Sequence, residues 1–269
     1  MTWRIWVCLV LSVVLAAAAL QLFGVSLWTV LFALITLACP AVMVWGYVTG
    51  LRPLPVPVGP VPETRGVTLD WLAPYYDGVC RLVGIGRSFR DRTLALAGLR
   101  PGERVLDIGC GTGVLTRRAA EIAGPSASVW GIDPTADMIR IARGRAAAEA
   151  STARFKPAAI ESLPFEADSF DLVLISFVLH HLPLDLKRSG LREVHRVLRR
   201  GGRLLVVDLD RASNRPLRLI QRLVLRHAFM AEHREGLTAD LVRQADFVNV
   251  TTVGAWRGLL GFWIAEKPG

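Results

Sequence analysis

An acidic residue followed by three closely spaced glycines is the part of this chain best suited to chemistry. Asp107 lies in a short apolar run, and Gly109, Gly111 and Gly113 come directly after it. Glycine lets the backbone turn sharply and removes the Cβ atoms that would keep a ligand away. The carboxylate of Asp107 would repel a pyrophosphate and suits a cationic ligand with an amino group. A dinucleotide loop also needs its third glycine one position later, where the chain has Val114.

A second acid completes this pattern. Asp133 lies 24 positions after Gly109, at the end of the apolar stretch 128–133. An acid at about this distance, at the end of the next strand, can accept hydrogen bonds from both hydroxyls of a ribose. The two acids therefore predict a nucleoside that also carries an amino group.

Further polar residues follow the apolar stretch 169–176. Ser176 and Phe177 should border the same cleft, because ligands bind at the carboxyl ends of the strands in a doubly wound sheet. His180 and His181 come next, and either imidazole can act as a base near neutral pH. Packing is the alternative role for both. Neither histidine has companions at metal-ligand spacing, so we predict no metal.

Strands and helices must alternate to position these residues. Helices are predicted to open at Thr112, at 135 or 136, and at 186. The stretch 66–100 should be helical and lie over the glycine loop. Strands are predicted at 105–108, 128–133, 153–156, 169–176 and 203–208, with a turn at 200–202 and a closing hairpin of 247–253 and 259–265.

Several motifs in this segment resemble those of class I S-adenosylmethionine (AdoMet) methyltransferases of the quinone-biosynthesis and sterol-type superfamily. They are Asp-x-Gly-x-Gly-x-Gly at 107–113, Leu-Pro-Phe at 163–165, Phe-Asp-Leu-Val at 170–173, His-His-Leu at 180–182 and Arg-Val-Leu-x-x-Gly-Gly-Arg-Leu at 196–204. The resemblance covers about residues 70–267. It implies an α/β fold with a Rossmann-like, doubly wound, seven-stranded sheet, in which 65–100 form a helical lid and 101–269 the core of a domain spanning 65–269.

The resemblance also implies which residues hold AdoMet. They are Tyr76, Asp107, Gly109, Cys110, Gly111, Gly113, Asp133, Pro134, Met138, Ala159, Ile160, Ser176 and Phe177. For Tyr76 and Met138, simple packing explains the residue type equally well. The chain departs from the family at Ala159, where members commonly have an aspartate that accepts from the adenine amino group. Its absence removes a hydrogen bond worth about 1.5–3 kcal/mol, although backbone groups at Ala159 and Ile160 can still hold the adenine.

The amino end has a different composition. Residues 5–51 contain no Asp, Glu, Lys or Arg. As one helix they would be roughly 65 to 70 Å long, about twice the thickness of a bilayer core. We therefore predict a transmembrane hairpin in residues 1–50, with helices at 5–23 and 27–47 and membrane contact through 5–48. A signal peptide that is cleaved after the first helix is the alternative, and it leaves the second helix as an anchor.

The flanking residues orient this hairpin. Arg4 and Arg52 lie on the same side of it, which places the catalytic domain in the cytoplasm by the positive-inside rule. Alternating prolines in 51–64 predict an extended linker. The four cysteines form no C-x-x-C pair, so neither a disulfide framework nor a zinc site is expected.

The formal net charge of +9 suits an anionic lipid surface or nucleic acid. The stretch 175–178 lacks the Asn/Asp-Pro-Pro-Tyr/Phe box that commonly serves methylation of base amino groups, which argues against nucleic acid. The sequence therefore predicts a membrane-anchored AdoMet-dependent methyltransferase for a small or lipid-like acceptor. A catalytically inactive methyltransferase-like scaffold and an NAD-binding reductase are the other hypotheses.

Overall fold

The computed structural model describes residues 60–69, 72–215, 218, 221 and 231–269. The predicted transmembrane hairpin at 1–50 and most of the predicted linker at 51–64 lie outside these residues. Among the described residues, no helix is long and apolar enough to cross a membrane.

The described domain is built on a seven-stranded sheet in the order β3-β2-β1-β4-β5-β7-β6. Strands β1 to β5 run parallel, and β7 pairs antiparallel with both β5 and β6. This confirms the predicted Rossmann-like, doubly wound sheet. The strands are β1 (Arg104–Ile108), β2 (Ser128–Asp133), β3 (Arg154–Pro157), β4 (Phe170–Ser176), β5 (Leu198–Leu209), β6 (Val248–Trp256) and β7 (Leu260–Glu266).

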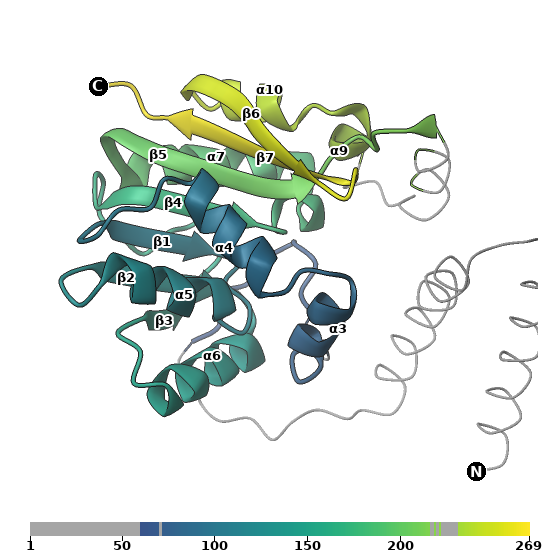
Figure 1. Cartoon of the computed structure of the whole chain (residues 1–269). Coiled ribbons are helices and arrows are strands. Elements are labelled where there is room, and N and C mark those ends of the chain that lie inside the picture. Colours follow the sequence, from purple (N-terminus) through teal and green to yellow (C-terminus); the bar gives the residue numbers. More distant parts are fainter. Residues whose placement is uncertain (1–59, 70–71, 216–217, 219–220, 222–230) are drawn as a thin grey trace, which may run out of the picture. The chain divides into compact units, whose positions relative to one another are not determined.

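Helices cover both faces of the sheet (Figure 1). Successive side chains of a strand point to opposite faces, so Leu172 and Leu174 join one apolar cluster while Val173 and Ile175 join the other. The first cluster includes residues of α4 (Arg87–Leu96), α5 (Val114–Ala123) and α6 (Ala136–Ala148), and the second includes residues of α7 (Leu184–Val197) and α10 (Thr238–Arg243). Burial on both faces explains the continuous apolar runs of the central strands.

The predicted helical lid at 65–100 is only partly helical. It contains α3 (Tyr76–Leu82) and α4, whereas residues 65–69 form no helix. The backbone N–H of Val67 instead donates to the carbonyl oxygen of His181 at 3.0 Å. This contact fastens the segment to the loop after β4, which contains a short 3-10 helix (Leu179–His181).

The prediction that a helix opens at Thr112 is wrong. Helix α5 begins at Val114, and its N-cap is Gly113, which has φ +75° and offers no side-chain cap. The hydroxyl of Thr112 instead donates to Asp77 of α3 at 2.7 Å. A left-handed residue before the helix needs glycine, so the loop extends one glycine further than the capping pattern predicted.

The predicted turn at 200–202 lies inside β5. Phe170 pairs with Leu198 and Leu172 pairs with Arg203, so three extra residues bulge out of β5 in this interval. Gly201 has φ +67° within the bulge. The glycines therefore allow an irregularity in the strand and do not end it.

The central strand β4 should dominate stability. Leu174 is fully buried between β1 and β5. We predict that Leu174→Ala lowers the free energy of unfolding by about 2–5 kcal/mol, because it leaves a cavity in a packed core. Val248 in β6 is 42% exposed, and Val248→Ala should change stability by less than about 0.5 kcal/mol. Urea unfolding of both variants checks this, and equal losses would contradict the assigned core.

Candidate cofactor and acceptor site

Strand β1 carries Asp107 into the interior of the domain. Its side chain is almost fully buried, and the hydroxyl of Thr116 in α5 donates to Oδ2 at 2.6 Å. Burial raises the pKa of Asp107 to about 7, although the bond from Thr116 opposes the rise. Asp107 is therefore poised to change its ionisation when a cationic group arrives beside it.

Strand β2 ends at Asp133, whose carboxylate holds two backbone segments. Its Oδ2 accepts from the N–H of Gly111 at 3.0 Å, and its Oδ1 accepts from the N–H of Thr135 at 2.9 Å. Asp133 thus fixes the glycine loop and the start of α6.

The glycines of the loop serve two purposes. Gly109 and Gly111 have φ +68° and +52° and line the cavities described below. A Cβ on Gly109 would lie 2.3 Å from Val178 Cγ2, so no side chain fits there. A Cβ on Gly113 would lie 2.7 Å from the ring of Phe155, and Gly113 lines neither cavity. Gly113 therefore allows close packing, which differs from its predicted contact with a ligand.

The predicted single cleft consists of two adjoining cavities. One of about 90 Å³ is lined by Asp133 and one of about 40 Å³ by Asp107. Tyr76, Gly109 and Phe177 line both cavities and so lie between them. Of the other predicted residues, the larger cavity includes Pro134, Met138, Ala159 and Ile160, and the smaller includes Cys110 and Ser176.

The donors and acceptors of these cavities suit a nucleoside that carries an amino group. Two carboxylates flank a loop of glycines, at the carboxyl ends of neighbouring parallel strands. The space is small, since ligand sites generally measure roughly 300–1,000 Å³. Tyr76 of α3 borders both cavities, so a ligand that reaches both acids would pass beside it.

Two charged residues at these cavities were not predicted from the sequence. Arg90 of α4 lines the smaller cavity; its Nη1 donates to the Ile85 carbonyl at 2.8 Å, and its buried Nε has no partner among the described residues. Glu161 lines the larger cavity, and its Oε2 is likewise buried without a partner in the described part of the chain. In the sequence, Arg90 is one of several arginines at helical spacing, which gives no sign of a ligand contact. Glu161 stands two residues after Ala159, where the family commonly has an aspartate, and this departure was a signal for it.

The two histidines take different positions. His181 lines the larger cavity, whereas His180 does not line either cavity. The Nδ1 of His180 lies 2.6 Å from Oδ1 of Asp208, and the two histidine rings are 4.0 Å apart. Asp208 is fully buried near the end of β5. Burial raises its pKa, but the neighbouring His180 outweighs this and holds the pKa well below its usual range.

Within the described ranges, no group of three or more His, Cys, Asp or Glu side chains is arranged to hold a metal ion. The described cysteines, Cys80 and Cys110, are both buried and free. The prediction of no metal remains a prediction for the chain as a whole.

The raised pKa of Asp107 gives a stability test. Between about pH 4 and pH 7 the folded state keeps a proton that the unfolded chain releases, so this contribution is lost as the pH rises to 7. Asp107→Asn cannot ionise. The free energy of unfolding of Asp107→Asn minus that of the unmodified chain should therefore rise by up to roughly 4 kcal/mol between pH 4 and pH 7. Above pH 7 this difference should stay constant.

Urea unfolding at several pH values measures this difference. Asp240, whose side chain is 54% exposed, provides the control, and Asp240→Asn should follow the unmodified chain across the range. Parallel pH profiles for Asp107→Asn and the unmodified chain would show that Asp107 is ionised in the folded state.

Comparisons with known proteins agree with this geometry. Residues 105–202 match the family model of a methyltransferase domain. The chain is 41% identical over 133 residues to the ubiquinone/menaquinone biosynthesis C-methyltransferase UbiE of Ectopseudomonas mendocina, which covers 49% of this chain and 51% of that protein. The UbiE of Burkholderia thailandensis is 37% identical over 128 residues, with 48% and 52% covered. The chain spans about half the length of the curated relatives it matches.

Solved structures share the fold. A SAM-dependent methyltransferase from Methanosarcina mazei is 26% identical with a TM-score of 0.51, and the match covers 62% of this chain and 92% of that one. A SAM-dependent methyltransferase from Aquifex aeolicus is 18% identical with a TM-score of 0.53, covering 72% and 96%. Residues 105–202 are therefore similar to a methyltransferase domain, and the described domain shares the fold of SAM-dependent methyltransferases.

Proposed function

We propose that this chain transfers the methyl group of AdoMet to a small, quinone-like acceptor. The observation that carries the proposal is the placement of Asp107 and Asp133 on either side of the Gly109–Gly111 turn. The UbiE relatives, whose names specify ubiquinone and menaquinone biosynthesis, support the acceptor class. Bound AdoMet supplies an activated methyl group on a sulfonium, and the residues of this chain bind, orient and exclude water.

Four side chains would hold the cofactor. Asp107 would accept from its amino group and Asp133 from its ribose hydroxyls. Arg90, with its unpartnered Nε beside Asp107, would bind its carboxylate. Glu161, with its unpartnered Oε2 in the cavity of Ala159, would take the adenine amino group in place of the family's aspartate.

The acceptor would lie near His181 and Phe177. Val178 and Leu182 also line this cavity and give it an apolar wall suited to a ring system. His181 would take the proton that a hydroquinone must lose before methylation. His180, held by Asp208 and stacked beside His181, is a positioning residue for that base.

The apolar residues 5–51 support a further part of this proposal, a membrane anchor with the catalytic domain on the cytoplasmic side. An anchor would place the cleft near an acceptor that dissolves in the bilayer. The inactive scaffold is the second candidate, because Ala159 lacks the family's adenine-binding acid. The match of residues 105–202 favours methyl transfer over the NAD-binding reductase.

Calorimetry of the full chain with AdoMet tests the cofactor assignment. Because Asp107 has a pKa of about 7 and would be ionised beside an ammonium group, the dissociation constant should rise about tenfold per pH unit below pH 7. Asp107→Asn should bind much more weakly at pH 8 and lose most of this pH dependence. Asp240→Asn is the control, and absence of binding at millimolar AdoMet would refute the proposal.

Turnover of labelled AdoMet with a hydroquinone acceptor separates the enzyme from the scaffold. His181→Ala should lower kcat by about 10²–10⁴-fold, and its effect on AdoMet affinity should be much smaller, because the proton transfer involves the acceptor alone. His195 packs against Phe247 and lines neither cofactor cavity, so His195→Ala provides the control variant. AdoMet binding without any turnover would support the scaffold.

A further inference from the structure

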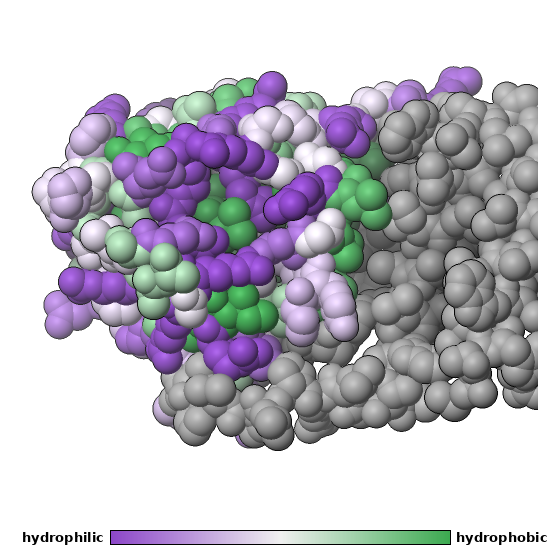
Figure 2. Space-filling view, turned by 60° about the horizontal axis from the view of Figure 1, so that its bottom comes forward, coloured by the Kyte–Doolittle hydropathy of each residue, from purple (hydrophilic) through white to green (hydrophobic). Residues whose placement is uncertain are grey.

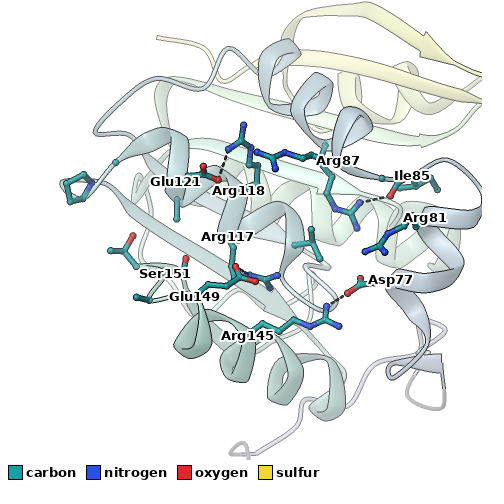
Figure 3. A pocket seen from close by; sticks show the side chains of 18 residues that line it. Asp77, Arg81, Ile85, Arg87, Arg117, Arg118, Glu121, Arg145, Glu149 and Ser151 are labelled. Carbon is teal, nitrogen blue, oxygen red and sulfur yellow. Dashed lines mark hydrogen bonds and ion pairs between the residues drawn. The ribbon is translucent and has the colours of Figure 1, made fainter.

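A cavity of about 1060 Å³ lies beside the cofactor residues and includes none of the predicted ones (Figure 3). Helices α3, α4, α5 and α6 all contribute to its lining. Its size is sufficient for a ligand of several charged groups. We call this cavity the arginine groove, after the residues described next.

Positive charge dominates the arginine groove. Its lining contains three carboxylates, Asp77, Glu121 and Glu149, and six arginines, Arg81, Arg87, Arg90, Arg117, Arg118 and Arg145. Asp91, outside the lining, also pairs with Arg118, which leaves two positive charges in excess. Figure 2 brings the lower side of Figure 1 forward. Hydrophilic side chains occupy much of the face that it shows.

Some of these arginines already have partners. Arg145 pairs with Asp77, Arg117 Nε lies 2.8 Å from Glu149, and Arg118 Nη1 lies 2.6 Å from Glu121. Figure 3 shows Asp77 of α3 beside Arg145 of α6, whereas Arg118 and Glu121 both belong to α5. These ion pairs give the groove a fixed shape, and they do not account for the excess of positive charge.

Three arginines of the lining lack a close carboxylate partner among the described residues: Arg81, Arg87 and Arg90. Arg90 also lines the smaller cofactor cavity, so Arg81 and Arg87 are the two that belong to the groove alone. The side chain of Arg81 is exposed and has no hydrogen bond or ion pair within the described residues. Arg87 is 78% exposed and lies 3.8 Å from Asp91, whose other oxygen receives Arg118 Nε at 2.7 Å. Both guanidinium groups therefore keep most of their donors for a ligand.

The start of α4 lies between these two arginines. Gly86 is its N-cap, no side chain caps the helix, and its first turn has no acidic residue. The first amides of a helix are unpaired within the helix and carry partial positive charge. The positive end of this helix adds to the positive potential of Arg81 and Arg87. Together they favour binding of an anion at this wall of the groove.

We propose that the arginine groove binds a ligand that carries phosphate groups, and that Arg81 and Arg87 make the principal contacts. The planar guanidinium fork matches phosphate oxygens in pairs, and the lining contains no lysine. Both free phosphorylated compounds and anionic lipid headgroups carry phosphate groups that could bind in this way. The site goes beyond the methyl transfer proposed above and does not depend on it.

Calorimetry of the full chain with inorganic pyrophosphate tests the site. The chain should bind about one pyrophosphate per site, and the double variant Arg81→Gln/Arg87→Gln should bind at least tenfold more weakly. Arg81→Lys/Arg87→Lys keeps the charge and should fall between the two. The control Arg188→Gln removes an exposed arginine from α7, on the opposite face of the sheet, and should change the affinity less than twofold.

Vesicles distinguish the two sources of phosphate. If the ligand is a headgroup, the chain should bind phosphatidylglycerol vesicles better than phosphatidylcholine vesicles, and the double glutamine variant should abolish that excess. If it is a free compound, pyrophosphate binding should depend on the two arginines while vesicle binding does not. If neither probe depends on Arg81 and Arg87, in variants with unchanged circular dichroism and AdoMet affinity, the groove is only an ion-pair network and the proposal fails.

Discussion

Two backbone amides, those of Gly111 and Thr135, hold the carboxylate of Asp133, and the geometry of the site depends on these bonds. They join the end of β2 to the glycine loop and to the start of α6. The N–H of Cys110 adds a bond to the carbonyl of Ile132 at 2.9 Å, so the loop is held along its length. One side chain thus orders both the glycine loop and the start of the following helix.

The same arrangement makes the ionised form of Asp107 costly in free energy. The glycine loop folds over the end of β1, so Asp107 is buried, and in the described part of the chain Thr116 supplies the hydrogen bonds to its carboxylate. A buried carboxylate with so few donors tends to stay protonated, which explains its pKa of about 7. A cationic ligand would relieve this cost, so the same residue that weakens the fold at high pH would strengthen binding.

Much of this domain could be predicted from the sequence because the relevant signals are local. Apolar runs located the strands, and the spacing of Asp107 and Asp133 located the carboxyl edge of the sheet. The helix start at Val114 was missed because a left-handed glycine replaced the expected threonine cap. The roles of Arg90, Glu161 and Asp208 depend on distant contacts or on a missing partner, neither of which appears as a pattern in the chain. The division of the cleft into two cavities likewise arises only from packing.

That division has a thermodynamic consequence. Tyr76 borders both cofactor cavities, and the next residue, Asp77, joins α3 to the glycine loop through Thr112 and to α6 through Arg145. A nucleoside that contacts Tyr76 therefore acts on the same short helix that forms one wall of the arginine groove. Any anion that favours one position of α3 would change the cofactor's affinity by some factor, and the cofactor would change the anion's affinity by that same factor.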